Sequence, residues 1–536
     1  MQLLSTKRHF YYLFLLIFLL TACKGLQSQS KRPQPLPQDL LIQVYFNHTE
    51  SEEYKEPYRQ QTRLGDDLEK QIIDSISQAK STVDVAVQEF RLPKIAEALA
   101  DRHKAGVKVR LILENNYSRP WSSLTAQEVK KLQKREQERY QEFSKFVDIN
   151  KDGKTSTEEV NQRDALIILR NAKIPWIDDT ADGSKGSSLM HHKFLIIDQR
   201  IAIVTSANFT LSDIHGDLIN PNSLGNANNL LKIDSPELAS IFTEEFNFIY
   251  AEKKFGLKKP FRPPKQITLG NSTITINFSP TSPTQPWIET SNGLIGKTLN
   301  SATKSIDTAL FVFSEQRIAN ILGTRHEKNV KIRSLIEPSF AYRPYSEALD
   351  MMGVALSDKC KYEIDNHPWQ NPITTVGVPI LSKGDLLHHK FGVIDNQTVI
   401  TGSHNWSEAA NYGNDEAVLV ISNPTIAAHY SQEFERIYRT AKLGLPGRIQ
   451  NQIKTQQKQC PKVTAPSTYE NKAIQKVNLN TASQKELEAL PGVGKKLASR
   501  IIVARQQKEF TSLKDLDKVS GVSVRLREKL GDRITW

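Results

Sequence analysis

The stretch Leu189-Met-His-His-Lys-Phe194 recurs almost unchanged as Leu386-Leu-His-His-Lys-Phe391. Each copy opens a longer pattern, His-x-Lys-x4-Asp-x6-(Gly/Thr)-Ser-x-Asn. The pattern residues are His191, Lys193, Asp198, Thr205, Ser206 and Asn208 in the first copy, and His388, Lys390, Asp395, Gly402, Ser403 and Asn405 in the second. Two such long patterns with one internal spacing indicate a duplicated unit. Its residue types suit phosphodiester cleavage, because one imidazole can attack phosphorus, a second can protonate the leaving oxygen, and two ammonium groups can hold the anion.

The paired pattern resembles the HKD motif of the phospholipase D superfamily. In that family two halves pack around a pseudo-twofold axis, and each half donates one motif to a single active site. The resemblance implies that one of His191 and His388 forms a covalent phosphohistidine while the other is the general acid, and we choose His191 as the nucleophile. No cofactor is expected for catalysis, and one chain completes the site without a dimer.

The same resemblance implies roles for the other motif residues. The groups expected to bind the non-bridging phosphate oxygens are Lys193, Lys390, Asn208 and Asn405. The carboxylates expected to hold the motif backbone are Asp198 and Asp395, and the hydroxyls expected to position it are Ser206 and Ser403. We expect His192 and His389 to pack. The family also has an acidic residue after the motif that orients an imidazole; Glu416 fits this role in the second half, and the equivalent in the first half is Asn228.

The duplication extends beyond the motifs. Ile72–Glu114 aligns with Ile295–Glu337 without a gap, at a constant offset of 223. Each stretch predicts a helix, a strand, a second helix and a strand; the predicted strands are Val83–Phe90, Val107–Leu113, Ile306–Phe313 and Val330–Ile336. We therefore predict an α/β fold in which two phospholipase D-like repeats, near 41–255 and 268–440, form one bilobal catalytic unit.

The catalytic histidines are only 197 residues apart, so the first half carries 26 extra residues before its motif. Asp148–Glu159 matches a calcium-binding EF-hand loop, with Gly153 at the sharp turn. The predicted ligands are Asp148, Asn150, Asp152, the Lys154 carbonyl, Ser156 and Glu159. A Thr125-x-x-Glu128 capping box should start the incoming helix. A structural Ca²⁺ is the prediction, and a solvated acidic turn is the alternative.

The N-terminus predicts a targeting segment. Lys7 and Arg8 precede an apolar run, Phe10–Leu20, which is short for a bilayer span. Leu20-Thr-Ala-Cys23 then resembles a bacterial lipoprotein box. We expect a signal peptide over 1–23, a lipidated Cys23, a flexible tether over 24–40, and a membrane-anchored protein facing away from the cytoplasm. An ordinary signal peptide or an uncleaved anchor are the alternatives. Cys360 and Cys460 could pair in an exported protein or remain thiols.

The C-terminus predicts a separate module. After a polar linker over 441–476, residues 477–536 resemble the helix-hairpin-helix domain of bacterial competence DNA receptors, which implies a small all-α domain. Its turns leave backbone N–H groups free to hold a DNA phosphate without reading sequence. The residues expected to contact DNA are Gly492, Gly494, Lys495, Lys496 and, in a second hairpin, Gly521. Residues 471–536 hold fourteen Lys and Arg against seven Asp and Glu, in a chain of net charge +12. A protein-contact module is the alternative.

Three functions compete. The first is an exported, membrane-tethered nuclease that cleaves DNA. The second is a phospholipase D acting on phosphatidylcholine-type lipids. The third is a DNA receptor whose catalytic fold is only a scaffold. The motifs alone do not separate the first two, because both substrates present the same diester, whereas the C-terminal module favours the nuclease.

Overall fold

The computed structural model describes residues 32–363, 365–460, 476–490, 492–523, 526–527, 530 and 533–536. The predicted signal peptide, with Cys23, and residues 461–475 of the predicted linker lie outside these residues. Within them, no helix is both long and apolar enough to cross a membrane.

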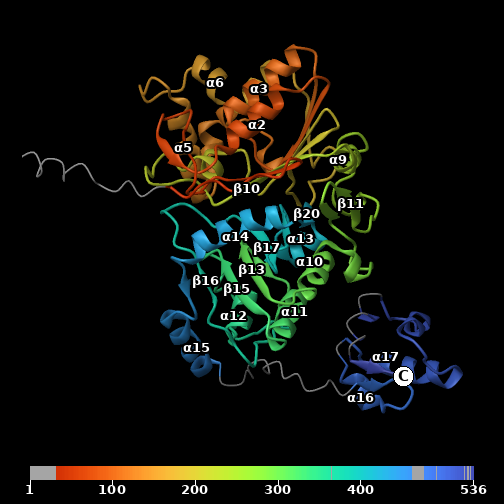
Figure 1. Ribbon diagram of the computed structural model, residues 1–536. Helices are drawn as coiled ribbons and strands as arrows, with labels where there is room; N and C mark the ends of the chain where they lie inside the picture. The colour runs from red at the N-terminus through yellow and green to blue at the C-terminus, as the bar shows by residue number, and fades with distance from the viewer. Residues whose placement is uncertain are drawn as a thin grey trace, which may run out of the picture.

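The first repeat is a seven-stranded mixed sheet (Figure 1). Its strands, in spatial order, are β1 (Ile42–Phe46), β10 (Asn229–Asp234), β9 (Ile201–Thr205), β8 (Lys193–Ile197), β4 (Thr82–Val87), β5 (Lys108–Leu113) and β6 (Trp176–Asp178). The central strand β8 reads Lys-Phe-Leu-Ile-Ile and is buried throughout, which is the continuous apolar pattern of a strand covered on both faces.

The second repeat has the same strand order with additions at its edges. Its path is β11 (Lys265–Leu269), β12 (Ser272–Ser279), β20 (Asn414–Ser422), β18 (Thr398–Gly402), β17 (Lys390–Ile394), β13 (Ser305–Leu310), β15 (Lys331–Ile336), β16 (Val376–Val378) and β21 (Lys442–Leu443). The predicted duplication and α/β class are therefore confirmed.

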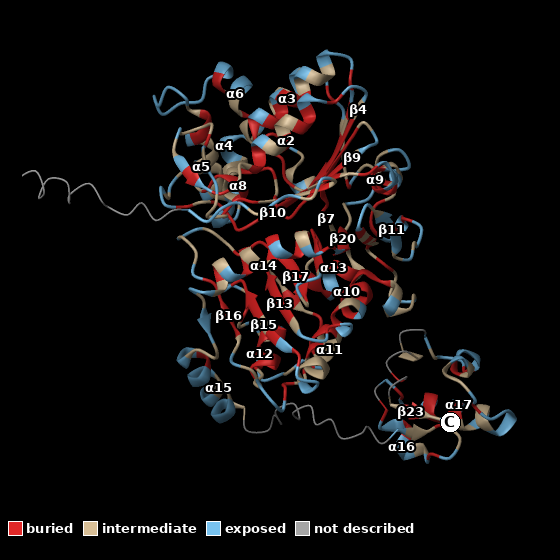
Figure 2. Cartoon of the chain, in the orientation of Figure 1, coloured by how far each residue is buried: buried red, intermediate tan, exposed pale blue. Residues whose placement is uncertain are grey.

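Equivalent helices cover the two sheets (Figures 1 and 2). In the first repeat they are α2 (Leu68–Ser77), α3 (Pro93–Lys104), α7 (Ala165–Asn171), the short α8 (Leu211–Ile214) and α9 (Pro236–Tyr250); in the second they are α10 (Ser291–Asn300), α11 (Gln316–Glu327), α12 (Glu347–Met351), the short α13 (Glu408–Tyr412) and α14 (Pro424–Tyr438). Helices α9 and α14 begin alike, with a capping Ser235 or Asn423 followed by proline.

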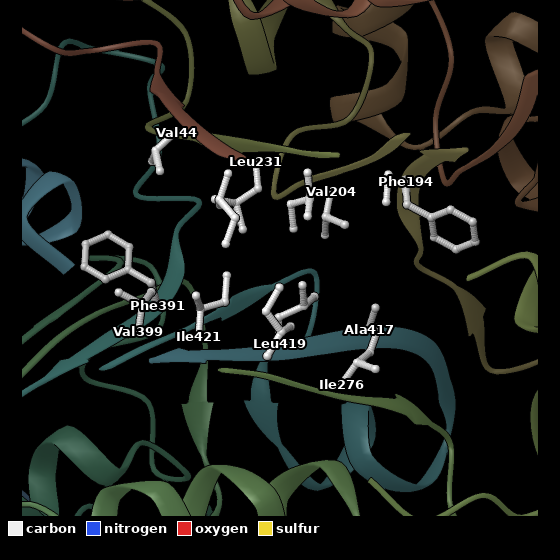
Figure 3. Close-up of a cluster of buried hydrophobic side chains, with 14 of the residues drawn as sticks. Val44, Phe194, Val204, Leu231, Ile276, Phe391, Val399, Ala417, Leu419 and Ile421 are labelled. Carbon is white, nitrogen blue, oxygen red and sulfur yellow. The ribbon is translucent and has the colours of Figure 1, made fainter. Parts of the chain in front are cut away.

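A large hydrophobic cluster joins the two repeats (Figure 3). Val204 and Leu231 of the first sheet face Leu419 and Ile421 of the second. Helix α14 of the second repeat also contacts β1 of the first. Separation of the lobes would expose this apolar surface, so the repeats form one folded unit with a fixed seam.

The net excess of the first half arises in the connection between β5 and α7, as predicted. This connection contains α4 (Ala126–Lys131), α5 (Lys134–Val147) and α6 (Thr157–Arg163). The Thr125 capping box is present, but the prediction of one continuous incoming helix is wrong, because the backbone is extended at Leu132. The Gln137 side chain donates to the carbonyls of Lys130 (3.2 Å) and Leu132 (2.8 Å), which satisfies the end of α4 and stabilises the break.

Cys360 and Cys460 form a disulfide, with their Cα atoms 5.6 Å apart. The bond attaches the end of α15 (Gly447–Gln459) to the loop after α12. Much of the segment predicted as linker is therefore a helix packed on the second repeat, with Ile449 buried in its core.

The C-terminal module has its own apolar core. It contains α16 (Gln484–Glu488), α17 (Lys495–Gln507), a 3₁₀ turn at Leu513–Lys518, and a parallel pair, β22 (Val477–Asn478) with β23 (Ile534–Thr535). The short strand pair corrects the all-α expectation, and it closes the module by joining its two ends.

Candidate active site

The backbone of each motif histidine is held by the backbone of the other repeat. His191 lies two residues before β8, and its N–H donates to the Asp415 carbonyl of β20 (3.0 Å). His388 lies two residues before β17, and its N–H donates to the Ala227 carbonyl (3.1 Å). The two motifs therefore meet across the seam, where strands from both lobes end.

The side-chain partners of the histidines are also exchanged between repeats. His191 Nδ1 lies 2.7 Å from Glu416 Oε2, and His388 Nδ1 lies 3.0 Å from Asn228 Oδ1. The sequence indicated both partner residues, but it did not indicate that each one contacts the histidine of the other repeat. Each bond holds Nδ1 as a donor and leaves Nε2 for chemistry, and only His191 has a directly bonded carboxylate.

The ammonium groups of the two motif lysines are close enough to repel each other. Lys193 Nζ donates to the His191 carbonyl (2.9 Å) and to Gln88 Oε1 (3.2 Å). Lys390 Nζ donates to the His388 carbonyl (2.7 Å) and lies 4.8 Å above the ring of Phe311. Both lysines are only 1% exposed, so their charge is concentrated where a phosphate could neutralise it.

Burial and mutual repulsion set the ionisation of this cluster. Burial, aided by the two lysine charges, holds the pKa of His191 and of His388 well below 6.5. Burial also lowers the pKa of Lys193 to about 8 and holds that of Lys390 well below its usual range. A bound anion favours every protonated form, so the site is arranged for a negatively charged ligand.

The motif asparagines and serines lie around the histidines. The Oδ1 atoms of Asn208 and Asn405 are buried without a hydrogen-bond partner, so neither side chain is held by a bond to its carbonyl oxygen. Ser206 Oγ donates to Asn228 Oδ1 (2.7 Å), and Ser403 Oγ accepts from the Ala417 N–H (3.1 Å). The serines therefore position the strand that carries each imidazole partner.

The motif aspartates lie past the far end of their strands, seven residues after the histidines, which is about 23 Å along the strand at 3.3 Å per residue. Asp198 accepts from the N–H groups of residues 80–82, and Asp395 accepts from those of residues 303–305. These bonds hold the start of the neighbouring strand. They fit the predicted holding role and place both carboxylates outside the reaction centre.

The second histidines of the motifs point into the protein. His192 Nε2 pairs with Glu245 Oε1 and His389 Nε2 with Glu433 Oε1, both at 2.9 Å. All four side chains are buried, so these are structural pairs that join each motif to α9 or α14.

Sequence reasoning missed two ionisable groups. Asp213 Oδ1 lies 3.8 Å from His388 Nδ1, and Asp213 Oδ2 accepts from the Asn208 N–H (2.8 Å). His404, the variable residue between Ser403 and Asn405, acts electrostatically on Glu416. Neither has a fixed place in the repeated pattern, so only the fold reveals them.

The predicted calcium loop has the expected helix–loop–helix outline, and Gly153 has a positive φ of 82°. Its side-chain oxygens, however, accept bonds from the loop's own backbone. Glu159 accepts from the N–H groups of Ile149, Asn150 and Ser156 and caps α6. Within the described residues no three His, Cys, Asp or Glu side chains converge as metal ligands. Calcium binding would require Glu159 to leave this cap, so it stays a prediction.

The predicted DNA-contact residues gather at one end of α17. Gly494 is its N-cap without a capping side chain, and Lys495 and Lys496 follow, both exposed. Gly492 has φ 82°, which any larger residue would strain. Gly521 of the second hairpin, with φ 95°, lies beside Arg500, whose guanidinium donates to the Ser520 carbonyl.

Comparisons with known proteins agree with this geometry. The family described as "Cardiolipin synthase, PLD-like domain" matches residues 72–250 and 295–438, and the "Helix-hairpin-helix motif" family matches 472–535. A mitochondrial cardiolipin hydrolase of Xenopus laevis is 27% identical over 142 residues, covering 26% of this chain and 57% of that protein. The mouse protein of the same name is 25% identical, covering 33% of this chain and 72% of that protein.

The chain therefore spans little more than half of the Xenopus relative. Among solved structures, phosphatidylserine synthase of Haemophilus influenzae aligns with a TM-score of 0.46 at 12% identity, covering 81% of this chain and 97% of that one. Because the first family covers both repeats and more than half of the residues, the chain belongs to the phospholipase D-like family, with a helix-hairpin-helix motif at its C-terminus.

Proposed function

We propose that the protein is a phosphodiesterase that cleaves DNA through a phosphohistidine on His191. The observation that carries the proposal is the crossed histidine pair, in which His191 is bonded to the carboxylate of Glu416 and His388 to the amide of Asn228. As Nε2 of a nucleophilic imidazole attacks phosphorus, the ring gains positive charge, which a carboxylate stabilises better than an amide.

The proposed reaction has two steps. His191 Nε2 attacks phosphorus, and the bond to the leaving oxygen breaks as His388 supplies its proton. His388 then removes a proton from water, which attacks the phosphohistidine and frees His191. Lys193 and Lys390, with the two motif asparagines, hold the non-bridging oxygens. Removing one such group should slow the reaction by about 10²–10³-fold.

DNA is the proposed substrate because the chain carries a basic helix-hairpin-helix module. The second candidate is phospholipid hydrolysis, which the names of the cardiolipin hydrolase relatives favour. Both reactions would use the same histidines, so the difference must come from surfaces outside the motifs.

The first test is nicking of supercoiled plasmid by the full mature chain in excess EDTA. Nicking should survive chelation and disappear in His191→Ala and in His388→Ala. Lys495→Ala/Lys496→Ala should raise the DNA concentration for half-maximal rate about tenfold, because phosphate contacts dominate such affinity. Hydrolysis of bis(p-nitrophenyl) phosphate should not change.

The matched control is Lys485→Ala/Lys508→Ala, which removes two exposed charges of the same module away from the start of α17. If folded protein cuts no DNA with or without calcium, the nuclease proposal fails, and vesicles of cardiolipin or phosphatidylcholine then test the lipid alternative.

The proposed location is a bacterial membrane surface outside the cytoplasm, through a lipid on Cys23. The support is the sequence alone, since these residues lie outside those described. Cys23→Ala should move the protein from the membrane to the soluble fraction. Mass spectrometry should find a lipid on the N-terminal cysteine of the unsubstituted protein, and an unmodified cysteine would refute the anchor.

Calcium is proposed as a structural ligand of loop 148–159. Added Ca²⁺ should raise the melting temperature of the chain by a few degrees, since a ligand of the folded state alone stabilises it. Glu159→Gln should abolish the increase, while Glu158→Gln, on the exposed side of α6, should keep it. Equal melting curves in EDTA and in millimolar Ca²⁺ would refute calcium binding, and the loop would then be a solvated acidic turn.

A further inference from the structure

A pocket of about 600 Å³ lies next to the segment that leads into His388. Glu337 lines it, and Glu337 Oε2 accepts from the N–H of Leu387, the residue before His388 (2.8 Å). Asp385, three residues before His388, lines the same pocket. The pocket therefore adjoins the backbone that carries His388.

The outer wall of the pocket comes from residues 439–460, which follow the family match ending at 438. Here β21 adds an antiparallel edge strand to β16, and α15 follows. The disulfide between Cys360 and Cys460 fixes the end of α15, and Gln456 exchanges two hydrogen bonds with the backbone of Ser357 (2.9 and 3.0 Å). The wall is a fixed part of the second lobe.

This wall is cationic. Residues 439–460 contain five Lys and Arg and no Asp or Glu. Two of them, Lys442 and Arg448, line the pocket, and both are exposed. Among the described residues neither pairs with a carboxylate, and the Arg448 guanidinium lies 5.3 Å above the ring of Tyr342.

The two carboxylates of the pocket are already engaged. Glu337 accepts from backbone at Leu387, and Asp385 accepts from the N–H groups of Leu224 (2.9 Å) and Gly225 (3.2 Å) across the seam. Both carboxylates are thus held by backbone N–H groups, whereas Lys442 and Arg448 have no carboxylate partner among the described residues. Such an arrangement fits a second anionic group on the same substrate.

We propose that this pocket binds the nucleotide next to the scissile phosphodiester in a nucleic-acid strand. Lys442 and Arg448 would neutralise the neighbouring phosphate, and the Tyr342 ring and the exposed Ile380 would contact its base. This deepens the proposed nuclease function and rests on it. A nucleic-acid strand is favoured over a lipid because its phosphates repeat along the backbone. In the sequence, the basic wall is also followed by the helix-hairpin-helix module.

The experiment compares substrates with one and two phosphates in the full mature chain. Bis(p-nitrophenyl) phosphate and the dinucleotide TpT carry one diester, and TpTpT carries two. The unsubstituted enzyme should cleave TpTpT with a kcat/KM about tenfold above that for TpT, as a charge-assisted contact implies. In Lys442→Ala/Arg448→Ala the tenfold advantage of TpTpT should disappear because its KM rises. The kcat/KM for bis(p-nitrophenyl) phosphate should stay the same.

Lys454→Ala/Lys458→Ala is the matched control, because it removes the same charge from exposed positions on α15, the helix that carries Arg448. Arg448→Lys, which keeps the charge, should retain part of the increment. Equal losses in the pocket variant and the control, or an increment that survives in the pocket variant, would overturn the pocket while leaving the nuclease intact.

Other outcomes separate the two proposals. Hydrolysis of bis(p-nitrophenyl) phosphate without cleavage of any nucleotide would overturn the nuclease, and the inference with it. If the pocket variant instead loses a preference for cardiolipin, which has two phosphates, over phosphatidylcholine, the occupant is a lipid headgroup and the nucleic-acid assignment is wrong.

Discussion

With bis(p-nitrophenyl) phosphate, His388→Ala should release one p-nitrophenolate per enzyme in a burst and then nearly stop. This leaving group is a weak base and departs without a general acid. His191 Nε2 can therefore still attack phosphorus and expel it. The second step needs a base to activate water, and without His388 the adduct should persist. Turnover should fall by about 10²–10⁴-fold.

His191→Ala should give neither burst nor adduct, with turnover reduced by at least about 10⁴-fold. Intact-mass analysis of quenched His388→Ala should show one added p-nitrophenyl phosphoryl group, on the peptide that contains His191. A burst in His191→Ala with the adduct on His388 would reverse the proposed roles. If neither variant gave a burst, the result would argue against a covalent histidine intermediate.

Much of the fold can be predicted from the sequence because the sequence contains two copies of the same unit. The constant offset of 223 aligned the helices and strands around Asp84 and Asp307, and both carboxylates do pair with an arginine of the next strand, Arg110 and Arg333. The change of offset located the insertion. Local rules also placed the Thr125 cap correctly.

The parts that could not be predicted depend on contacts between distant residues. Nothing local indicates that Glu416 serves the histidine of the other lobe, since the crossing follows from how the two sheets meet. Likewise Leu132 has an ordinary helical neighbourhood, and its break depends on Gln137. The pairing of Cys360 with Cys460 required the path of α15, which has little apolar content and is held by a few anchors.

The pH dependence of the enzyme should reveal the two histidines separately. Catalysis requires His191 neutral and His388 protonated, while both pKa values in the free site lie well below 6.5. As pH rises through the lowered pKa of His388, the acid is lost; as pH falls through that of His191, the nucleophile is lost. The profile of kcat/KM should therefore peak below pH 6.5 and decline toward neutrality.

Glu416→Gln should lower the maximum of that profile by about 10²-fold, since the group that stabilises the developing charge is removed. It should also move the acidic limb to lower pH, because loss of the carboxylate lowers the pKa of His191 further. The complementary variant is Asn228→Asp, which places a carboxylate on His388, raises its pKa and should move the basic limb toward neutrality.

The two substitutions change one bond each on opposite sides of the pseudo-symmetric site, so their effects should fall on opposite limbs. A general loss of packing would lower the maximum in both variants without moving either limb. If both variants move the same limb, the histidines do not have separate jobs. Opposite movements would show that the difference between Glu416 and Asn228 divides one duplicated motif into a nucleophile and an acid.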